Sequence, residues 1–556
     1  MTSQRLCAVI GLLALWLAQL AVARTAVTPV KELRQRPRAS PADDDEPDLE
    51  SLYPAHNLSV PIDHFHNSTL YAPHSNGTFP LRYWYSAAHY APGGPVIVLC
   101  SGETSGVNRL PFLYKGIVYQ LAKATGGLGV ILEHRYYGTS FPVDDLTTES
   151  LRFLTTEQAL ADTDYFARNV VFEDVDADLS PESAPWIMYG GSYAGAFVAF
   201  LRVLYPGTFW GAISSSGVTE AIYDYWQYFE PIRIHGPRAC VDTTQAFVRV
   251  IDGILLRCPS DADLTARLKE TFLLPNVTYD DDFANVLSGG ITGWQGRNWD
   301  PEVNDPSFGY YCDNITTGEL LYPDTEGLRD SVAELIGASG GAAGAAHEDD
   351  SSLTDRMLNW IGYVNATAVA PCAADSGSTQ NQCFTNRNAT YYAQTDLAQT
   401  WRAWAYQYCT QWGYLQTGSG APAHIDPLVS RTIDLEYTSL ICRDAFDIWT
   451  SSDVQAINRY GGFDISYPRL AIVDGEADPW KEATPHATVA RDRASTVEEP
   501  FLLIEGAVHH WDENGLLPNE TTADLPPQPV ADTQATERDF VRAWVAEWYM
   551  RKDRRA

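Results

Sequence analysis

The chain has 556 residues and a formal net charge of −33, with a sequence pI of about 4.6. A surface this acidic repels nucleic acid and anionic membranes, so neither is an expected partner. Hydrophobic residues make up 45% of the chain, which is typical of a globular protein. The length exceeds what one simple core supports, so we expect one large domain with an insertion, or two domains.

The first 50 residues are typical of export and processing segments. Arg5 precedes an apolar run over residues 6–18, and Ala21-Val22-Ala23 is a small-residue cleavage site. Residues 1–23 therefore indicate a secretory signal peptide, with a signal anchor as the alternative. Residues 24–50 are rich in proline, arginine and acids and predict a disordered leader or propeptide. We expect a secreted, extracellular protein, or alternatively one of the vacuolar or lysosomal lumen.

Nine cysteines are present, and Cys7 belongs to the predicted signal peptide. An oxidising compartment makes disulfides the default for the other eight, seven of which lie between residues 240 and 442. Cys100 ends a predicted buried strand and is the candidate to remain unpaired. No Cys/His cluster has zinc spacing, so no metal site is predicted. Asn-x-Ser/Thr sequons predict glycosylation at Asn57, Asn67, Asn76, Asn276, Asn314, Asn365, Asn388 and Asn519.

Apolar runs alternate with helical patterns in both the first and the last part of the chain. The alternation predicts a parallel α/β sheet, with residues 51–220 and 441–556 forming the two parts of one core. Thr155 and Gln158 have the spacing of a capping box at the start of one of the helices. Strands are expected at 79–85, 95–100, 129–133, 186–189, 211–216, 469–473 and 500–504, and helices at 114–125, 154–171, 196–204 and 536–551.

Residues 221–440 differ from these flanks. Tyrosine, tryptophan, cysteine and helical periodicity dominate the segment, which we interpret as an inserted, mostly helical cap. Residues 338–351 interrupt it with a run of Gly, Ala and acids, which predicts a low-complexity, mobile loop.

Ser192 lies at the centre of Gly190-Gly-Ser-Tyr-Ala-Gly195, between a predicted strand and a predicted helix. This arrangement indicates the nucleophile elbow of the α/β-hydrolase fold, whose usual pattern is Gly-x-Ser-x-Gly. The turn is so tight that its neighbours must be small. Here Ala194 occupies the position of the second glycine, and the glycine follows at position 195.

The other groups that this chemistry needs follow later strands. In this fold the triad comes in the chain order Ser, acid, His, each just past a strand end. Asp474, Glu476 and Asp478 follow the strand at 469–473, and His509 and His510 follow the strand at 500–504. The order fits, but the pattern alone leaves open which acid and which histidine take part.

The residue types match the reaction that they would carry out. A serine hydroxyl needs an imidazole to take its proton, and the imidazole needs a carboxylate to fix its tautomer. The oxyanion needs two N–H donors, for which we predict the backbone of Tyr193 and of the Gly102/Glu103 loop. This chemistry requires no cofactor.

Beyond these motifs the chain resembles the prolyl carboxypeptidase / dipeptidyl peptidase II family of serine peptidases. The resemblance implies that the triad acid is Asp478, before Pro-Trp, and that the base is His509, the first of the histidine pair. It also implies cleavage after proline, with Trp480 lining the proline pocket. An extra Val508 before the pair leaves His510 as the alternative base. The matching stretches are residues 60–65, 133–138, 153–162, 190–195, 478–480 and 509–512.

We therefore predict a secreted, glycosylated serine peptidase with an α/β-hydrolase core and a disulfide-containing helical cap. It would cleave on the carboxyl side of proline through an acyl-enzyme on Ser192. The alternatives are an esterase or serine carboxypeptidase of the same fold without proline preference, and a non-catalytic peptide-binding glycoprotein. Peptide substrates are the expected partners, and a homodimer is compatible with the sequence.

Overall fold

The computed structural model describes residues 47–340, 350–375 and 377–554. The predicted signal peptide and residues 24–46 of the predicted leader lie outside the described residues, as do residues 341–349 of the low-complexity loop. The end of the leader is described, and Leu49–Leu52 form a short helix, α2, capped by Asp48. No helix in the described part of the chain combines the length and apolarity that a membrane span requires.

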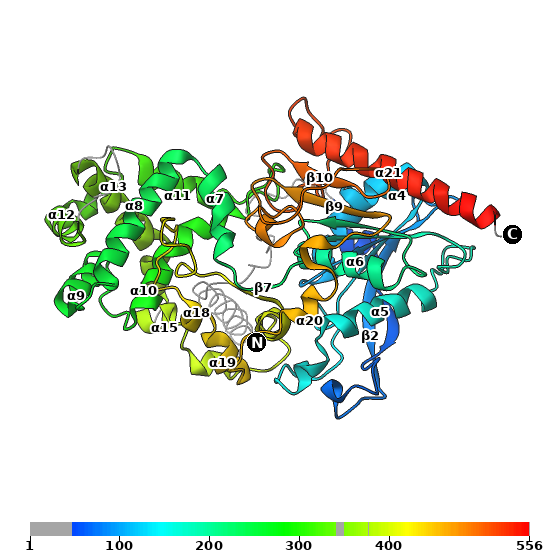
Figure 1. Ribbon diagram of the computed structural model, residues 1–556, viewed down its shortest axis with the longest axis horizontal. Helices are drawn as coiled ribbons and strands as arrows, with labels where there is room; N and C mark the ends of the chain where they lie inside the picture. The colour runs from blue at the N-terminus through cyan, green and yellow to red at the C-terminus, as the bar shows by residue number, and fades with distance from the viewer. Residues whose placement is uncertain (1–46, 341–349, 376, 555–556) are drawn as a thin grey trace, which may run out of the picture.

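An eight-stranded sheet forms the centre of the core (Figure 1). Its order is β1-β2-β4-β3-β5-β6-β9-β10; β1 and β2 are antiparallel to their neighbours, and the other pairs are parallel. The strands are β1 (His56–Pro61), β2 (Thr78–Ser86), β3 (Val96–Cys100), β4 (Leu128–Leu132), β5 (Trp186–Gly191), β6 (Gly211–Ser215), β9 (Leu470–Gly475) and β10 (Phe501–Ile504).

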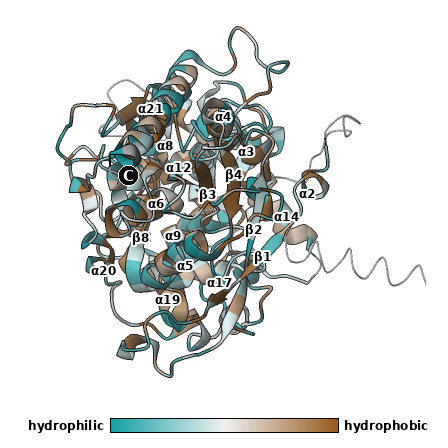
Figure 2. Cartoon of the chain, turned by 90° about the vertical axis from the view of Figure 1, so that its right-hand side faces the viewer, coloured by the Kyte–Doolittle hydropathy of each residue, from teal (hydrophilic) through white to brown (hydrophobic). Residues whose placement is uncertain are grey.

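The middle strands of the sheet are buried on both faces, as their continuous apolar runs predict. Along β3, Val96, Val98 and Cys100 point into one core cluster, whereas Ile97 and Leu99 point into the other. The hydropathy colours in Figure 2 show β3 and β4 as hydrophobic strands within the molecule. Each face of the sheet therefore needs its own layer of helices.

Helices supply these two layers, as the α/β-hydrolase class requires. On one face α3 (Leu110–Tyr114) and α4 (Ile117–Thr125) lie against the sheet with the long closing helix α21 (Gln528–Asp553). On the other face lie α5 (Thr156–Asn169) and α6 (Tyr193–Leu204). The predicted fold class, an α/β-hydrolase core with a helical cap, is confirmed.

Two helix predictions need correction. The closing helix begins at Gln528 rather than Thr536, because the proline at its N-terminus can start a helix. The capping box is only half formed. The Thr155 hydroxyl accepts from the Gln158 N–H, but the Gln158 side chain instead accepts from the His64 N–H and donates to Asp63.

The segment after β6 is mostly helical, as predicted, and lies beside the sheet (Figure 1). Two short parallel strands, β7 (Ile222–Asp224) and β8 (Gly413–Leu415), connect its two ends. Its helices are α7 (Glu230–His235), α8 (Arg238–Leu255), α9 (Ala262–Thr271), α10 (Asp280–Leu287), α11 (Ser307–Thr316), α12 (Arg329–Ala338), α13 (Asp350–Val364), α14 (Ala370–Ala374), α15 (Gln380–Phe384), α16 (Ala389–Tyr392), α17 (Trp401–Gln407), α18 (Leu435–Thr438), α19 (Leu440–Phe446) and α20 (Gln455–Asn458).

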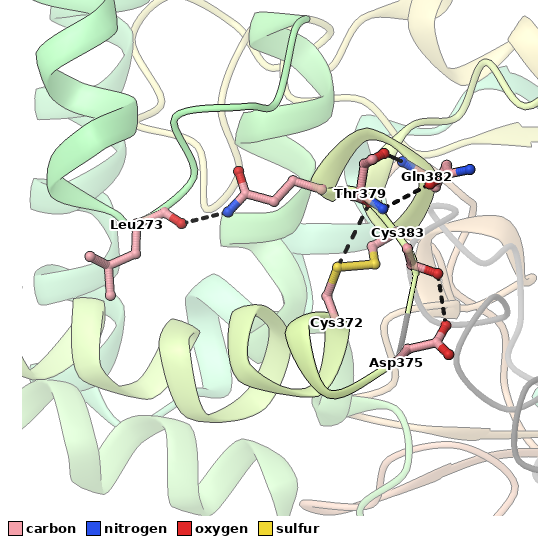
Figure 3. The surroundings of a disulfide bond; sticks show 8 residues. Leu273, Cys372, Asp375, Thr379, Gln382 and Cys383 are labelled. Atoms are coloured by element: carbon pink, nitrogen blue, oxygen red, sulfur yellow. Dashed lines mark hydrogen bonds between the residues drawn. A yellow bond between two sulfur atoms is a disulfide. The ribbon is translucent and has the colours of Figure 1, made fainter.

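Three disulfides stabilise this cap: Cys240–Cys312, Cys372–Cys383 and Cys409–Cys442. Figure 3 shows Cys372–Cys383, which joins the end of α14 to α15 beside the capping residue Thr379. Among the described residues two cysteines remain free: Cys100 is buried, and Cys258 is exposed. The cap is therefore disulfide-stapled as predicted, with Cys258 as an additional free thiol.

Candidate active site

Ser192 lies at a sharp turn between β5 and α6. Its backbone has φ 60° and ψ −126°, a region that residues other than glycine rarely adopt, and its N–H donates to the Ser215 carbonyl at 2.9 Å. A Cβ at Gly190 would lie 2.1 Å from the Ala194 carbonyl oxygen, and one at Gly195 would lie 2.8 Å from Gly217 Cα. The structure thus explains why the strict glycine of this turn is at 195, where α6 crosses the loop after β6.

The three candidate acids, Asp474 at the end of β9 and Glu476 and Asp478 just after it, have different partners. The Asp474 carboxylate pairs with His486 Nδ1 at 2.7 Å. The Glu476 carboxylate accepts from the Gly506 N–H at 3.0 Å. The Asp478 carboxylate, which is fully buried, accepts from His509 Nδ1 with both oxygens, at 2.9 and 3.1 Å. The alternatives left open by the sequence are therefore separated by geometry, and Asp478 is the acid that the structure brings to a histidine of the pair.

His509 is held in the tautomer that a general base needs. Its Nδ1–H donates to Asp478, so Nε2 carries the lone pair, and this buried atom has no hydrogen-bond partner among the described residues. Burial lowers the pKa of His509, Asp478 opposes this effect, and the neighbouring His510 adds to it. The imidazole is thus kept in its neutral, proton-accepting form.

His510 belongs to a second, separate pair. Its Nδ1 lies 2.8 Å from the Glu513 carboxylate, and its backbone N–H donates to the Ser216 hydroxyl at 2.9 Å. Burial alone would lower the pKa of His510, but Glu513 outweighs burial and raises it. The His509 and His510 ring centroids are 4.4 Å apart, so a charge on His510 acts directly on His509.

The loop after β3, which contains Gly102 and Glu103, lies against the first turn of α6. A Cβ added at Gly102, whose φ is 69°, would come within 3.2 Å of the Ala194 Cβ. Tyr193 is the first residue of α6, so its N–H has no acceptor within the helix. The two predicted N–H sources therefore lie on neighbouring segments beside Ser192.

Glu133 fixes this loop, a role that motif spacing did not predict. Its side chain is fully buried and accepts from the Gly106 N–H at 2.8 Å and from Arg82 Nη2 at 2.6 Å. The same carboxylate also accepts from the Ser140 hydroxyl at 2.7 Å. Glu133 thus joins the loop after β3 to the loop after β4.

The next residue, His134, fixes the side chain that follows the nucleophile. His134 Nδ1 donates to the Arg135 carbonyl at 2.7 Å, which leaves Nε2 as the acceptor for the Tyr193 hydroxyl at 2.9 Å. Burial lowers the pKa of His134 to about 4, so it stays neutral and keeps this role. The Glu-His-Arg-Tyr-Tyr-Gly stretch could have signalled these roles only through its unusual density of polar groups after a buried strand.

Trp480 is buried in an aromatic cluster rather than open to solvent. Its ring stacks on Tyr225 with centroids 5.3 Å apart, and the edges of Tyr228 and Tyr414 contact it. Its indole N–H donates to the Gln295 side chain at 2.9 Å, and its backbone N–H donates to Asp478. Trp480 therefore lies where the core meets the cap, and its role in lining a proline pocket stays a prediction.

The cap also holds the two loops that carry the acid and the base. Trp294 Nε1 donates to the Ala477 carbonyl, and the Tyr225 hydroxyl donates to the Pro479 carbonyl, on either side of Asp478. Trp299 Nε1 donates to the Trp511 carbonyl, two residues after His509. The placement of the acid and the base therefore depends on the cap as well as on the sheet.

None of the eight predicted glycosylation asparagines is buried. Five are exposed, namely Asn57, Asn67, Asn76, Asn276 and Asn519. The other three, Asn314, Asn365 and Asn388, are partly exposed. Glycosylation stays a prediction that this placement permits.

Comparisons with known proteins agree with the site. The family model "Serine carboxypeptidase S28" matches residues 60–291 and 343–524. A probable extracellular serine carboxypeptidase of Arthroderma benhamiae is 51% identical over 527 residues, covering 94% of this chain and 72% of the relative. The serine protease vicPa of Bipolaris victoriae is 29% identical over 495 residues, covering 86% and 87%.

Among solved structures, a proline iminopeptidase of Mycobacterium smegmatis aligns with 88% of this chain and 99% of its own, at 11% identity and a TM-score of 0.34. A likeness this distant says nothing about activity, and the fold assignment rests on the strand order and the elbow described above. The family match covers most of the chain, including the elbow, the acid loop and the histidine loop. The chain belongs to the serine carboxypeptidase S28 family and is a serine-type peptidase.

Proposed function

We propose that the protein hydrolyses peptides on the carboxyl side of proline, with Ser192 as nucleophile, His509 as general base and acid, and Asp478 as the orienting carboxylate. The observation that carries the proposal is the buried His509–Asp478 pair, whose Nε2 has no partner among the described residues. The next residue, His510, lies against Gly191 of the elbow, where a Cβ would be 3.3 Å from its ring. The alternatives, an esterase or a peptide-binding glycoprotein, are outcomes of the test below.

Acylation follows from the tautomer of His509. Nε2 accepts the Ser192 hydroxyl proton while Oγ attacks the carbonyl carbon of the proline residue. Asp478 stabilises the imidazolium that forms, without itself taking the proton. The imidazolium then gives its proton to the leaving amine, and the C–N bond breaks to leave an ester on Ser192.

Deacylation repeats these steps with water. His509 Nε2 takes a proton from the water that attacks the ester carbonyl, and then returns it to Ser192 Oγ as the acyl group departs. In both halves of the reaction the negative oxygen would lie against the N–H of Tyr193 and of the Gly102/Glu103 loop. Preorganised donors of this kind do not need to reorganise when charge develops. Glu133 contributes by holding the loop that carries one of these donors in place.

The aromatic wall around Trp480 supports a preference for proline. Tyr225, Tyr228 and Tyr414 hold the indole two residues from Asp478, where a flat apolar surface suits an uncharged ring. A relative named as a serine carboxypeptidase supports removal of a C-terminal residue, so the proposed product is a single amino acid released after proline.

Secretion is part of the proposal. The relative from Arthroderma benhamiae is named extracellular, and the three disulfides of the cap suit an oxidising compartment. The predicted signal peptide and the unburied sequons agree with export through the secretory pathway.

The test uses purified protein and peptides that end in Pro-X, peptides with an internal proline, peptides with an N-terminal X-Pro, and matched peptides without proline. Mass spectrometry identifies the products. Release of the C-terminal residue from Pro-X peptides, absent in Ser192→Ala, is the expected result. Equal rates on peptides without proline would refute the preference, and hydrolysis of aryl esters alone would favour an esterase.

Asp478→Asn and Asp474→Asn form a matched pair for the triad. Asp474 lies at the end of β9 and Asp478 just after it, and both pair with a histidine, but only Asp478 reaches His509. We expect Asp478→Asn to lose on the order of 10⁴-fold in kcat, as this change does in a serine protease. Asp474→Asn should retain activity when folded, and an equal loss in both variants would contradict the assignment.

A further inference from the structure

Asp63, His66 and His74 form a cluster on the side of the core, in the connection between β1 and β2. One nitrogen from each imidazole and one oxygen from the carboxylate all lie within 4.8 Å of one another. The three residues are spread over 12 positions, from 63 to 74. This spacing matches no zinc motif, which is why the sequence predicted no metal site.

The Asp63 carboxylate is already positioned as a metal ligand would be. Its side chain is fully buried, and Oδ1 accepts from the Phe65 N–H at 2.8 Å and from Gln158 Nε2 at 2.9 Å. Its other oxygen, Oδ2, faces His74 Nδ1 at 2.7 Å. Metal-binding carboxylates are typically held by outer hydrogen bonds of this kind, which fix their direction and keep one oxygen for the metal.

The two histidines complete the set from the solvent side. His66 and His74 are both exposed, and their ring centroids lie 5.6 Å apart with the planes 32° from parallel. Exposed imidazoles can turn with little cost, whereas the buried carboxylate cannot. The cluster is therefore one fixed ligand with two adjustable ligands above it.

We propose that Asp63, His66 and His74 bind a divalent transition metal of the Zn²⁺ type, with a water molecule as the fourth ligand. Two imidazoles and a carboxylate suit Zn²⁺ or Co²⁺ rather than Ca²⁺ or Mg²⁺, which prefer oxygen ligands. Metal–ligand distances of about 2.0–2.2 Å place tetrahedral ligand atoms ~3.3 Å apart. His74 Nδ1, now 2.7 Å from Asp63 Oδ2, must therefore move slightly outward, and ligand atoms that are up to 4.8 Å apart must come closer.

Binding exchanges one contact for another without net chemistry on the protein. The metal takes the place of the proton between His74 Nδ1 and Asp63 Oδ2. That proton leaves to solvent from an imidazolium, or is exchanged through solvent for one on Nε2 in a neutral ring, so the bound imidazole carries its single proton on Nε2. The occupied site would join the loop before β2 to the loop after β1 and, through Gln158, to α5. Because ligands that bind only the folded state stabilise it, the metal would act as a clamp on this edge of the core.

The test compares wild type with His66→Ala and His74→Ala, and uses His424→Ala as a matched control. His424 is also exposed but belongs to the cap and not to the cluster. Circular dichroism without metal first establishes that all four proteins are folded. Co²⁺ titration followed by visible absorption then gives the number and environment of bound ions, and Zn²⁺ is tested by thermal unfolding.

We expect wild type and His424→Ala to bind one more Co²⁺ per chain than either cluster variant, with the absorption of a tetrahedral site. Zn²⁺ should raise their Tm by roughly 1 °C for each tenfold excess over its Kd, while Ca²⁺ and Mg²⁺ should not. Identical Co²⁺ binding and Zn²⁺ shifts in all four proteins would overturn the proposal. Neither readout involves peptide turnover, so the result is independent of the proposed function.

Discussion

His510 should set the acid limit of the activity by lowering the pKa of His509. The two ring centroids are 4.4 Å apart, and the contact between His510 and Glu513 raises the pKa of His510, which favours its cationic form. A nearby positive charge disfavours protonation of His509. Replacing His510 by Asn removes this charge and also suits the backbone, because the φ of 37° at this position is tolerated better by Asn than by most residues.

The size of the effect follows from the distance. Two unit charges 4.4 Å apart interact by about 4 kcal/mol at an effective dielectric constant of about 20. The Glu513 carboxylate, 2.8 Å from His510, offsets most of this field, so we expect a net shift of about one pKa unit, or ~1.4 kcal/mol. The pKa of His509 rises in His510→Asn, so His509 loses its proton only at higher pH. The acid limb of kcat/KM therefore moves to higher pH.

The assay is kcat/KM against pH for wild type and His510→Asn on one Pro-X peptide. At a pH below both limbs the variant should be about tenfold slower, and above both limbs the two rates should converge. His486→Asn is the matched control, since it removes a buried histidine that pairs with a different acid, Asp474. An acid limb that stays in place or moves to lower pH in His510→Asn would refute the reasoning.

Two further predictions concern Glu133, which holds the loop after β3, and the disulfides of the cap. Glu133→Gln weakens the charge-assisted hydrogen bonds to the Gly106 N–H and Arg82. We expect kcat to fall by about tenfold to 1000-fold with a smaller change in KM, and the Tm of the variant shows whether it is folded. An unchanged kcat in a folded variant would contradict the prediction. Removing the disulfide at Cys240, whose partner is 72 residues away, should cost ~4 kcal/mol of cap stability, against ~3 kcal/mol at Cys372, whose partner is 11 residues away. Denaturant unfolding of the two double-alanine variants checks the order, and the reverse order would contradict it.

Local pattern was enough to predict the elements that carry the chemistry. The strand–serine–helix pattern placed Ser192 at its turn, because a tight turn restricts the residues around it to small ones. The seven predicted strands were placed to within two residues of their ends, and the middle ones are continuously apolar because they are buried on both faces. The edge strand β1 was not predicted.

The hydrogen-bond partners of the side chains could not be derived from local pattern, because they depend on contacts between residues far apart in the sequence. Asp474, Glu476 and Asp478 look equivalent along the chain, and only the folded loops give them His486, the Gly506 N–H and His509 as partners. Gln158 fits a capping box in sequence, yet its side chain reaches Asp63, 95 residues away. The Asp63, His66 and His74 cluster was missed for another reason: its residues are near one another in the chain, but their spacing matches no zinc motif.

The central claim is that Ser192 is a nucleophile activated by His509, and covalent labelling tests it most directly. The protein is treated with a fluorophosphonate probe, and the modified peptide is identified by mass spectrometry. Our account predicts a single adduct on Ser192, no adduct in Ser192→Ala, and much slower labelling in a folded His509→Ala variant. An adduct on another serine, or labelling of Ser192→Ala at the wild-type rate, would contradict it.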